Sequence, residues 1–194
     1  ISGLAVNIVR SVGDSLNAAI GQGYVLASPL QLAVMAARLA SGTSIQPRLV
    51  RSVDGVETPV VGAEPLDLNE NHLRLVRNGM DAVVNSNRGT AYRSRVDLDG
   101  QTMAGKTGTS QVRSVVVSNQ DVPWEERDHA LFVAFAPYAA PRYAVSVIVE
   151  HGGGGSTAAA PVARDILLFA LNGSLPPLDT YPSDQRGQIE ELFA

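Results

Sequence analysis

Lys106 is the residue of this chain whose type and setting point most directly to chemistry. It is the one lysine among fifteen Lys and Arg residues, and a compact ammonium cannot simply be exchanged for a guanidinium beside a reacting group. Glycines and small hydroxyl residues surround it, in the order Ala104-Gly105-Lys106-Thr107-Gly108-Thr109-Ser110. Such a stretch lets a substrate lie close to the backbone and find hydroxyl donors there. The plainer interpretation is a polar loop with a solvated lysine, the usual state of charged side chains.

The composition describes a globular protein of modest size. A length of 194 residues predicts one domain, with room for an appendage. Hydrophobic residues make up 45% and charged residues 18%, which argues against disorder. The net charge of -4 and the lack of a basic patch argue against nucleic acid as a partner. The absence of cysteine excludes disulfides and thiolate chemistry.

Local signals predict several helices and one hairpin. Ser28 and Pro29 are typical of a helix start and Gly42 of its end; because this helix is apolar almost all round, we expect it to be buried on most sides. Asp54-Gly55 predicts a tight hairpin between strands over 47–53 and 56–61. A second helix is expected over 68–85. Residues 1–13 have no clear period, and Gly21-Gln22-Gly23 indicates a turn.

The second half of the chain predicts a sheet and one more helix. We expect strands near 102–112, 129–137 and 142–150, the last two joined by a short turn and therefore antiparallel. Pro161 begins a helix ended by Gly173, with Val162, Ile166 and Phe169 at helical spacing. This helix should pack on one face of the sheet. The prolines and acidic residues after Gly173 predict a surface tail over 174–194.

Two short motifs suggest other functions. Residues 100–107 match the phosphate-binding P-loop pattern, from Gly100 to Thr107. A P-loop needs an apolar strand before it and a helix starting at the lysine, whereas here the preceding residues are mostly polar and glycine and valines follow. His151 with its glycines is similar to an esterase oxyanion loop, but the chain has no G-x-S-x-G pentapeptide.

Several segments in order resemble one family. The stretch from Lys106 resembles the KTG motif of penicillin-binding transpeptidases and serine β-lactamases. The segments at 13–17, 20–23 and 28–33 are similar to the region upstream of that motif in class B penicillin-binding proteins, and those at 129–137 and 147–161 to the strands and helix that follow it. The glycine run is most similar to that of the penicillin-binding protein 2 group, the transpeptidases of cell elongation. The resemblance covers about residues 13–172.

The resemblance implies a role for each residue around Lys106. Lys106 would hold positive charge near the substrate carboxylate and assist a proton relay. Thr107 and Thr109 would offer hydroxyls to that carboxylate, and the backbone N–H of Thr109 would be an oxyanion donor. Gly108 would let the substrate lie along the strand edge, and Ser110 completes the substrate-binding stretch.

The family's nucleophile motif, S-x-x-K, cannot occur in this chain, because Met103 stands three residues before the only lysine. Ser15-Leu16-Asn17 fits the family's second motif, S-x-N, but lies inside a segment that matches a different stretch, so we interpret it as a coincidence. The nucleophile is therefore not in the chain, and we expect the chain alone to be inactive.

Together these features predict an α+β fold, the C-terminal part of a transpeptidase domain over 1–173 with a surface tail over 174–194. The resemblance implies that the parent protein cross-links peptidoglycan stem peptides ending in D-Ala-D-Ala through a seryl ester and binds β-lactams. It implies no cofactor and no metal. The expected partners are the missing N-terminal part of the same domain and proteins of a cell-elongation complex.

The expected location is the periplasmic face of the bacterial inner membrane. No apolar run here is long enough to span a bilayer, so an anchor would lie outside this chain. The alternatives to the transpeptidase function are a P-loop nucleotide-binding protein and a non-catalytic interaction module.

Overall fold

A three-stranded antiparallel sheet forms the centre of the molecule. The computed structural model describes residues 12–19, 26–59, 62–113, 115 and 117–193. The sheet order is β3-β4-β5. The regular elements are α1 (Val12–Ala19), α2 (Pro29–Ser41), β1 (Ser52–Val53), β2 (Val56–Glu57), α3 (Glu70–Asn85), β3 (Ala104–Ser110), β4 (His129–Ala136), β5 (Tyr143–Val149), α4 (Ala160–Asn172) and α5 (Arg186–Phe193). The predicted α+β class and the three predicted strands are confirmed.

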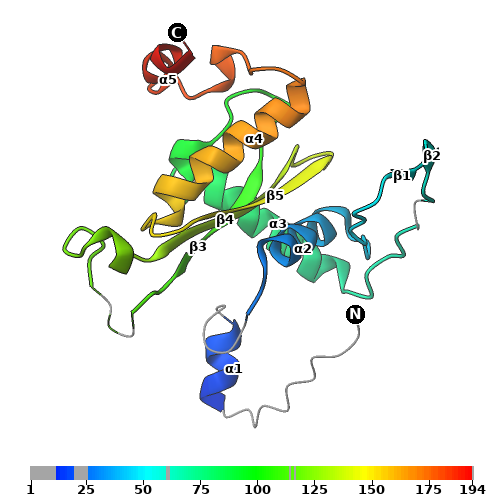
Figure 1. Ribbon diagram of the computed structural model, residues 1–194, viewed down its shortest axis with the longest axis horizontal. Helices are drawn as coiled ribbons and strands as arrows, with labels where there is room; N and C mark the ends of the chain where they lie inside the picture. Colours follow the sequence, from blue (N-terminus) through cyan, green and yellow to red (C-terminus); the bar gives the residue numbers. More distant parts are fainter. Residues whose placement is uncertain (1–11, 20–25, 60–61, 114, 116, 194) are drawn as a thin grey trace.

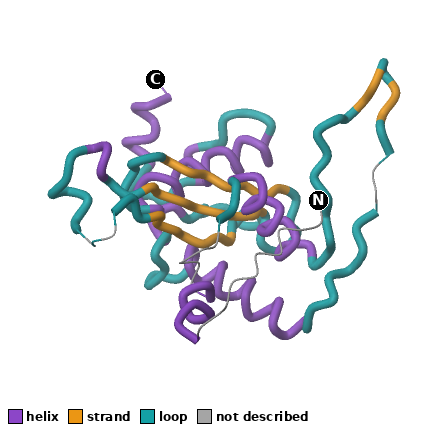
Figure 2. Tube along the Cα trace, turned by 60° about the horizontal axis from the view of Figure 1, so that its bottom comes forward, coloured by secondary structure: helices purple, strands orange, loops and turns teal. Residues whose placement is uncertain are grey.

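Helices cover both faces of this sheet (Figures 1 and 2). Phe132 and Ala134 of β4 are fully buried in a cluster that includes Ala163 and Leu167 of α4. Phe135, on the alternate side of β4, packs with side chains of α2 and α3 instead. Because neighbouring residues of a strand point to opposite faces, α4 lies on one face and the α2–α3 pair on the other. The prediction that the 161–172 helix packs on one face is confirmed.

The ends of α2 follow directly from local chemistry. The Ser28 hydroxyl accepts a hydrogen bond from the Gln31 amide at 3.3 Å, and the Gln31 side chain accepts one from the Ser28 amide at 2.8 Å. This reciprocal cap satisfies two amides that the helix leaves unpaired. At the other end Gly42 takes the left-handed conformation with φ 75°, and its amide donates to the Arg38 carbonyl at 2.8 Å. The predicted start and end are therefore both confirmed.

The expected burial of α2 on most sides is wrong for this structure. Only Ala36 and Ala40 of this helix are buried, whereas Leu30 and Met35 remain 54% and 42% exposed. An apolar sequence shows that a helix has several surfaces suited to burial, but each surface needs a packing partner. Among the described residues, the sheet and α3 are the main packing partners of α2, and they leave Leu30 and Met35 uncovered.

The predicted hairpin is present with shorter strands. β1 and β2 pair antiparallel over two residues each, and Asp54 and Gly55 have φ of 50° and 82°. Positive φ at both central residues is the geometry that an Asp-Gly turn favours. All four strand residues are exposed, so the sheet core gives this hairpin no support. The helix predicted over 68–85 is confirmed as α3, capped by the side chain of Asn69.

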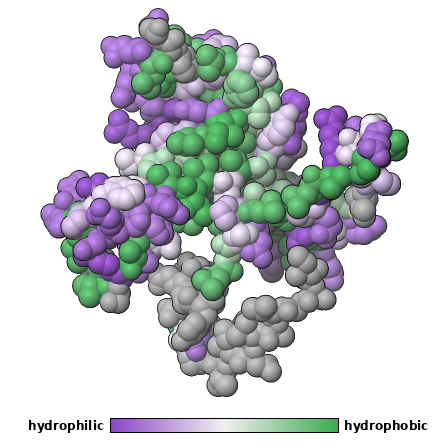
Figure 3. Space-filling model, in the orientation of Figure 1, coloured by the Kyte–Doolittle hydropathy of each residue, from purple (hydrophilic) through white to green (hydrophobic). Residues whose placement is uncertain are grey.

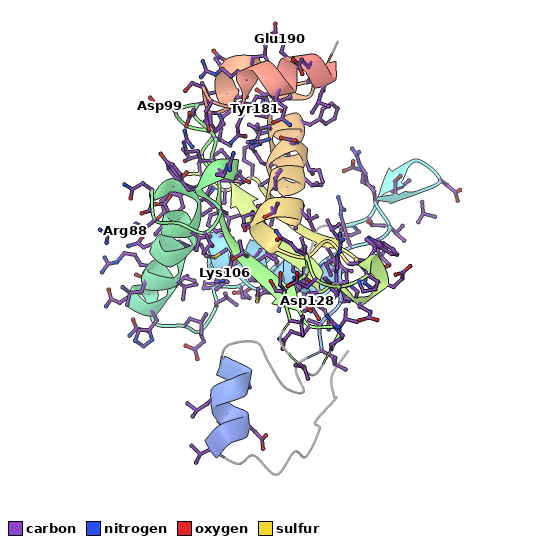
Figure 4. All side chains as sticks on the ribbon, turned by 90° about the vertical axis from the view of Figure 1, so that its left-hand side faces the viewer. Arg88, Asp99, Lys106, Asp128, Tyr181 and Glu190 are labelled. Atoms are coloured by element: carbon purple, nitrogen blue, oxygen red, sulfur yellow. The ribbon has the colours of Figure 1, made fainter. Side chains whose placement is uncertain are left out.

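The end of the chain packs against the first half of α4, at Arg164. Thr180 and Tyr181 are 0% and 1% exposed, and the guanidinium of Arg164 lies 4.7 Å from the centre of the Tyr181 ring. Arg164 also donates to Gln185 at 2.9 Å. Figure 4 shows Tyr181 between α4 and α5. These buried contacts fix the beginning of the 174–194 segment.

Two predictions fall on residues whose structure is not described. The turn at Gly21-Gln22-Gly23 lies outside the described residues, as does most of the 1–13 segment. Ser15 lies on α1 and is exposed. None of the helices in the described ranges has both the length and the apolar character needed to cross a membrane.

Candidate active site

β3 carries Lys106 in its middle. The strand pairs antiparallel with β4, and Lys106 stands opposite Val133. The first two residues, Ala104 and Gly105, are buried, whereas Lys106, Thr109 and Ser110 are exposed. The strand therefore begins in the core and emerges at the surface, carrying its polar side chains to solvent.

An apolar groove lies beside Lys106. It has a volume of about 380 Å³ and is formed by α2, α3 and the two strands β3 and β4, with the lining residues Met35, Leu39, Val76, Gly79, Met80, Val83, Lys106 and Val133. We call this the Lys106 groove. Figure 4 shows Lys106 beside α3. The lysine is the single charged residue in the lining.

The ammonium of Lys106 donates to the backbone carbonyl of its neighbour Thr107 at 2.7 Å. No carboxylate in the described part of the chain forms an ion pair with it. An ammonium held by a neutral carbonyl at the surface keeps donors free for an anion, because it has three N–H groups. The geometry is suited to binding a carboxylate.

The hydroxyl residues after Lys106 are not equivalent. Thr107 is half-buried, and its Oγ1 lies 3.1 Å from the Oγ1 of Thr90, in the turn after α3. Thr109 and Ser110 are exposed. The strand therefore presents one hydroxyl supported by Thr90 and two exposed hydroxyls near the single lysine.

The glycine run after β5 supports the strand that carries the site. A side chain on Gly155 would collide with the carbonyl of Leu131 and would lie 2.6 Å from the carbonyl oxygen of Gly108. Gly153 has φ 79° and its amide donates to the Asp128 carbonyl at 2.8 Å. Glycine at 155 therefore lets this loop lie directly against the backbones of β3 and β4.

His151 fixes the start of the same loop. Its amide donates to Nδ1 of His129 at 2.9 Å, and its own Nδ1 lies 3.1 Å from the carbonyl oxygen of Arg127. Its ring is also 4.7 Å from those of Trp124 and His129. These contacts give His151 a structural part in joining the loop before β4 to the loop after β5.

The geometry gives no support to the nucleotide alternative. In a P-loop the lysine lies where a helix starts, so that the helix N-terminus meets the phosphates. Here Lys106 is the third residue of β3, and Thr107 to Ser110 continue the strand. Gly100 has φ 78° but is followed by three residues without regular structure before the strand begins.

The sequence predictions located the lysine strand but missed two of its supports. Thr90 and Gly155 contact Thr107 and the Gly108 backbone across 17 and 47 positions of the chain. Gly155 belongs to a glycine run that was visible in the sequence. Nothing near Thr90 signals its contact, because it rests on how α3 and β3 pack.

Comparisons with known proteins agree with this arrangement. Residues 3–168 match the family described as the penicillin binding protein transpeptidase domain. Peptidoglycan D,D-transpeptidase MrdA of Haemophilus influenzae is 34% identical over 191 residues, covering 92% of this chain and 29% of that protein. The chain thus spans less than a third of the length of this relative.

Two solved structures are similar in fold as well as in sequence. Penicillin-binding protein 2 of Pseudomonas aeruginosa, in complex with WCK 5153, gives a TM-score of 0.65 at 39% identity, covering 84% of this chain and 34% of that one. The Helicobacter pylori protein of the same name, in complex with MreC, gives 0.65 at 35% identity, covering 84% and 29%. Family match, identity and fold coincide, and we conclude that this chain belongs to the penicillin-binding protein transpeptidase family, in which it fits the C-terminal part of the domain.

Proposed function

We propose that this chain is the substrate-binding portion of a peptidoglycan D,D-transpeptidase that cross-links stem peptides by serine acyl transfer. The observation that carries the proposal is the setting of Lys106. Its ammonium pairs with no carboxylate of the described residues, and the hydroxyl residues that follow it lie on the same strand, β3. The donor is a peptide ending in D-Ala-D-Ala, and β-lactams act as its mimics.

Each residue of the strand has a part in this function. Lys106 attracts the terminal carboxylate and takes part in the proton relay, while Thr107 and Thr109 donate their hydroxyls to the same carboxylate. The backbone N–H of Thr109 donates to the oxyanion that forms during acyl transfer. Gly108 and Ser110 line the strand edge along which the peptide lies.

The nucleophile comes from outside this chain. The parent protein supplies it in an S-x-x-K motif, which this sequence does not contain. The chain alone is therefore inactive. The remainder of the same domain packs against the Lys106 groove, because an apolar groove of this size beside a charged site favours burial.

The remaining parts of the proposal concern the whole protein. Residues 1–173 belong to the transpeptidase domain and residues 174–194 form a tail on its surface. The parent lies on the periplasmic face of the bacterial inner membrane, held by an anchor outside this chain. A relative has been crystallised with MreC, which supports partners from a cell-elongation complex.

The test is covalent labelling of the parent protein with a fluorescent penicillin. We expect a seryl adduct outside this chain, and Lys106→Ala should lower the acylation rate by about 100-fold, roughly the loss of one strong charge-assisted contact in the transition state. Arg74→Ala is the control, since Arg74 is exposed, does not line the Lys106 groove, and hydrogen-bonds only to Asn71 among the described side chains. A stable adduct on any serine of this chain would contradict the proposal.

The nucleotide alternative is tested on the same protein. An equilibrium titration with Mg-ATP should show no binding that depends on Lys106. Micromolar affinity that disappears in Lys106→Ala would replace the transpeptidase function with a nucleotide-binding one.

A further inference from the structure

Thr90 lies beside the site, although its residue type and neighbours in the sequence give no sign of that position. Its Oγ1 is 3.1 Å from the Oγ1 of Thr107, the residue that follows Lys106. The two hydroxyls come from different elements, since Thr90 follows α3 and Thr107 lies on β3. A contact between such distant parts of the chain is kept only if both backbones are fixed.

The turn that carries Thr90 is fixed on the end of α3. The amide of Ala91 donates to the Val83 carbonyl at 2.9 Å, and Ala91 is 1% exposed. The amide of Gly89 donates to the Ser86 carbonyl at 2.8 Å. A side chain on Gly89 would collide with the carbonyls of Ala82 and Val83. Thr90 therefore lies between Gly89, a position that only glycine can occupy without a clash, and the buried Ala91.

The same end of α3 is joined to the start of β3. The Asn85 side-chain amide donates to the Met103 carbonyl at 3.0 Å and to the Asp81 carboxylate at 2.7 Å. Met103 is fully buried and immediately precedes the strand. Asn85 thus ties the end of α3, from which the Thr90 turn continues, to the residue before β3, and this supports the short distance between the two hydroxyls.

The number of protons on a hydroxyl makes this contact directional. A hydroxyl donates one hydrogen bond only. If Thr107 donated to Thr90, its proton would not be available to a ligand. If Thr90 donates to Thr107, the Thr107 proton is free for an anion, and each hydrogen bond in such a chain strengthens the next.

We propose that Thr90 is a positioning residue that donates to Thr107 and thereby aims the Thr107 hydroxyl at the substrate carboxylate. The inference rests on the proposed transpeptidase function. Thr90 itself does not touch the substrate. Its effect is confined to ligands that have a free carboxylate, because the directed hydroxyl serves that group.

Acylation of the parent protein by benzylpenicillin and by its methyl ester tests this. Thr90→Val keeps the shape of the side chain and removes the donor. It should lower the acylation rate with benzylpenicillin roughly three- to tenfold, the usual worth of one hydrogen bond, and leave the rate with the ester unchanged. Thr90→Ser keeps the hydroxyl and should restore the rate to within about twofold.

A double-mutant cycle separates this role from a structural one. If Thr90 acts through Thr107, Thr90→Val should add no further loss in a Thr107→Val background. Equal losses for both compounds, or losses that add in the double variant, would overturn the proposal while leaving the transpeptidase function in place. If the wild-type parent is not acylated by benzylpenicillin at all, the proposed transpeptidase function is wrong, and the proposed role of Thr90 is wrong as well.

Discussion

Gly105 sets how closely β3 can approach β4 next to Lys106. A β-carbon at this position would lie 2.8 Å from Cε1 of Phe132 and 2.7 Å from the carbonyl oxygen of Val133. Phe132 is fully buried in the cluster with α4, so it cannot turn away without disturbing the core. Close packing of this kind makes even one added methyl group costly.

We therefore predict that Gly105→Ala lowers the free energy of unfolding by about 1–3 kcal/mol, measured by denaturant unfolding of the parent protein. Gly187→Ala is the matched control, because no atom lies within 4 Å of its β-carbon position on α5. That substitution should be neutral or stabilise by up to about 0.5 kcal/mol. Equal effects of the two substitutions would contradict the packing described for Gly105.

Some residues of the site could be predicted from the sequence and others could not. Lys106 stands out because its type is unique in the chain and its neighbours are small. Thr90 does not, because its contact with Thr107 depends on the packing of α3 on β3. Residue type and spacing indicate chemistry along one segment, whereas a contact between segments needs the fold.

Element boundaries were predictable because they depend on local chemistry. The capped helix from Pro29, the Asp54-Gly55 hairpin and the helix end at Gly173 all have their signals within a few residues. The faces that elements bury were less predictable. On α4 the spaced residues Val162, Ile166 and Phe169 are 43–53% exposed, while the opposite side, with Ala163 and Leu167, packs on the sheet.

The reason lies in the shape of the contact. α4 carries apolar residues on several sides, and its periodicity alone does not say which side meets the sheet. Small residues such as Ala160 and Ala163 let the helix approach the sheet closely, so that side is buried and the larger side chains stay outside. Figure 3 shows the hydrophobic residues left on the outer side of α4.

Between α2 and α3, the proposed packing of the remaining domain would cover the Lys106 groove, and this can be tested with a substitution in its lining. Val76 lines the groove and is 45% exposed here. A carboxylate placed there would be buried without a partner once the groove is covered. Val76→Glu in the parent protein should therefore lower the free energy of unfolding by about 2 kcal/mol or more.

Leu75→Glu is the control for this prediction. Leu75 precedes Val76 on α3, is 66% exposed and does not line the groove. A surface substitution of this kind should change the free energy of unfolding by no more than about 0.5 kcal/mol. If Val76→Glu has as small an effect as Leu75→Glu, the groove stays open in the parent protein.

Across the whole molecule, the end of the chain is connected to the segment that leads into β3. The amide of Asp97 donates to the Thr180 carbonyl at 2.9 Å, and the Gln185 side chain donates to the carbonyl of Arg93. Arg93 and Asp97 both lie between the Thr90 turn and β3. The tail therefore contributes to the stability of the same region that carries the site.

The pH dependence of stability tests this contact between tail and domain. Burial of the phenol and then the negative charge of Asp165 raise the pKa of Tyr181 to about 12, against the opposing charge of Arg164. In the unfolded chain the phenol has a pKa of 10.0. Between these values the folded protein keeps a proton that the unfolded chain has lost, so folding stability falls as the pH rises. The contribution is complete below about pH 10 and is lost by about pH 12, for a total of roughly 3 kcal/mol.

The measurement is the free energy of unfolding of the parent protein from pH 9 to pH 12, compared with that of Tyr181→Phe. The phenylalanine variant keeps the ring beside Arg164 and removes the titrating hydroxyl. Wild type should lose stability more steeply than the variant, by up to about 1.4 kcal/mol per pH unit, the slope for one proton. Parallel curves would mean that Tyr181 titrates in the folded protein as it does in the unfolded chain, and that the tail does not bury it against α4.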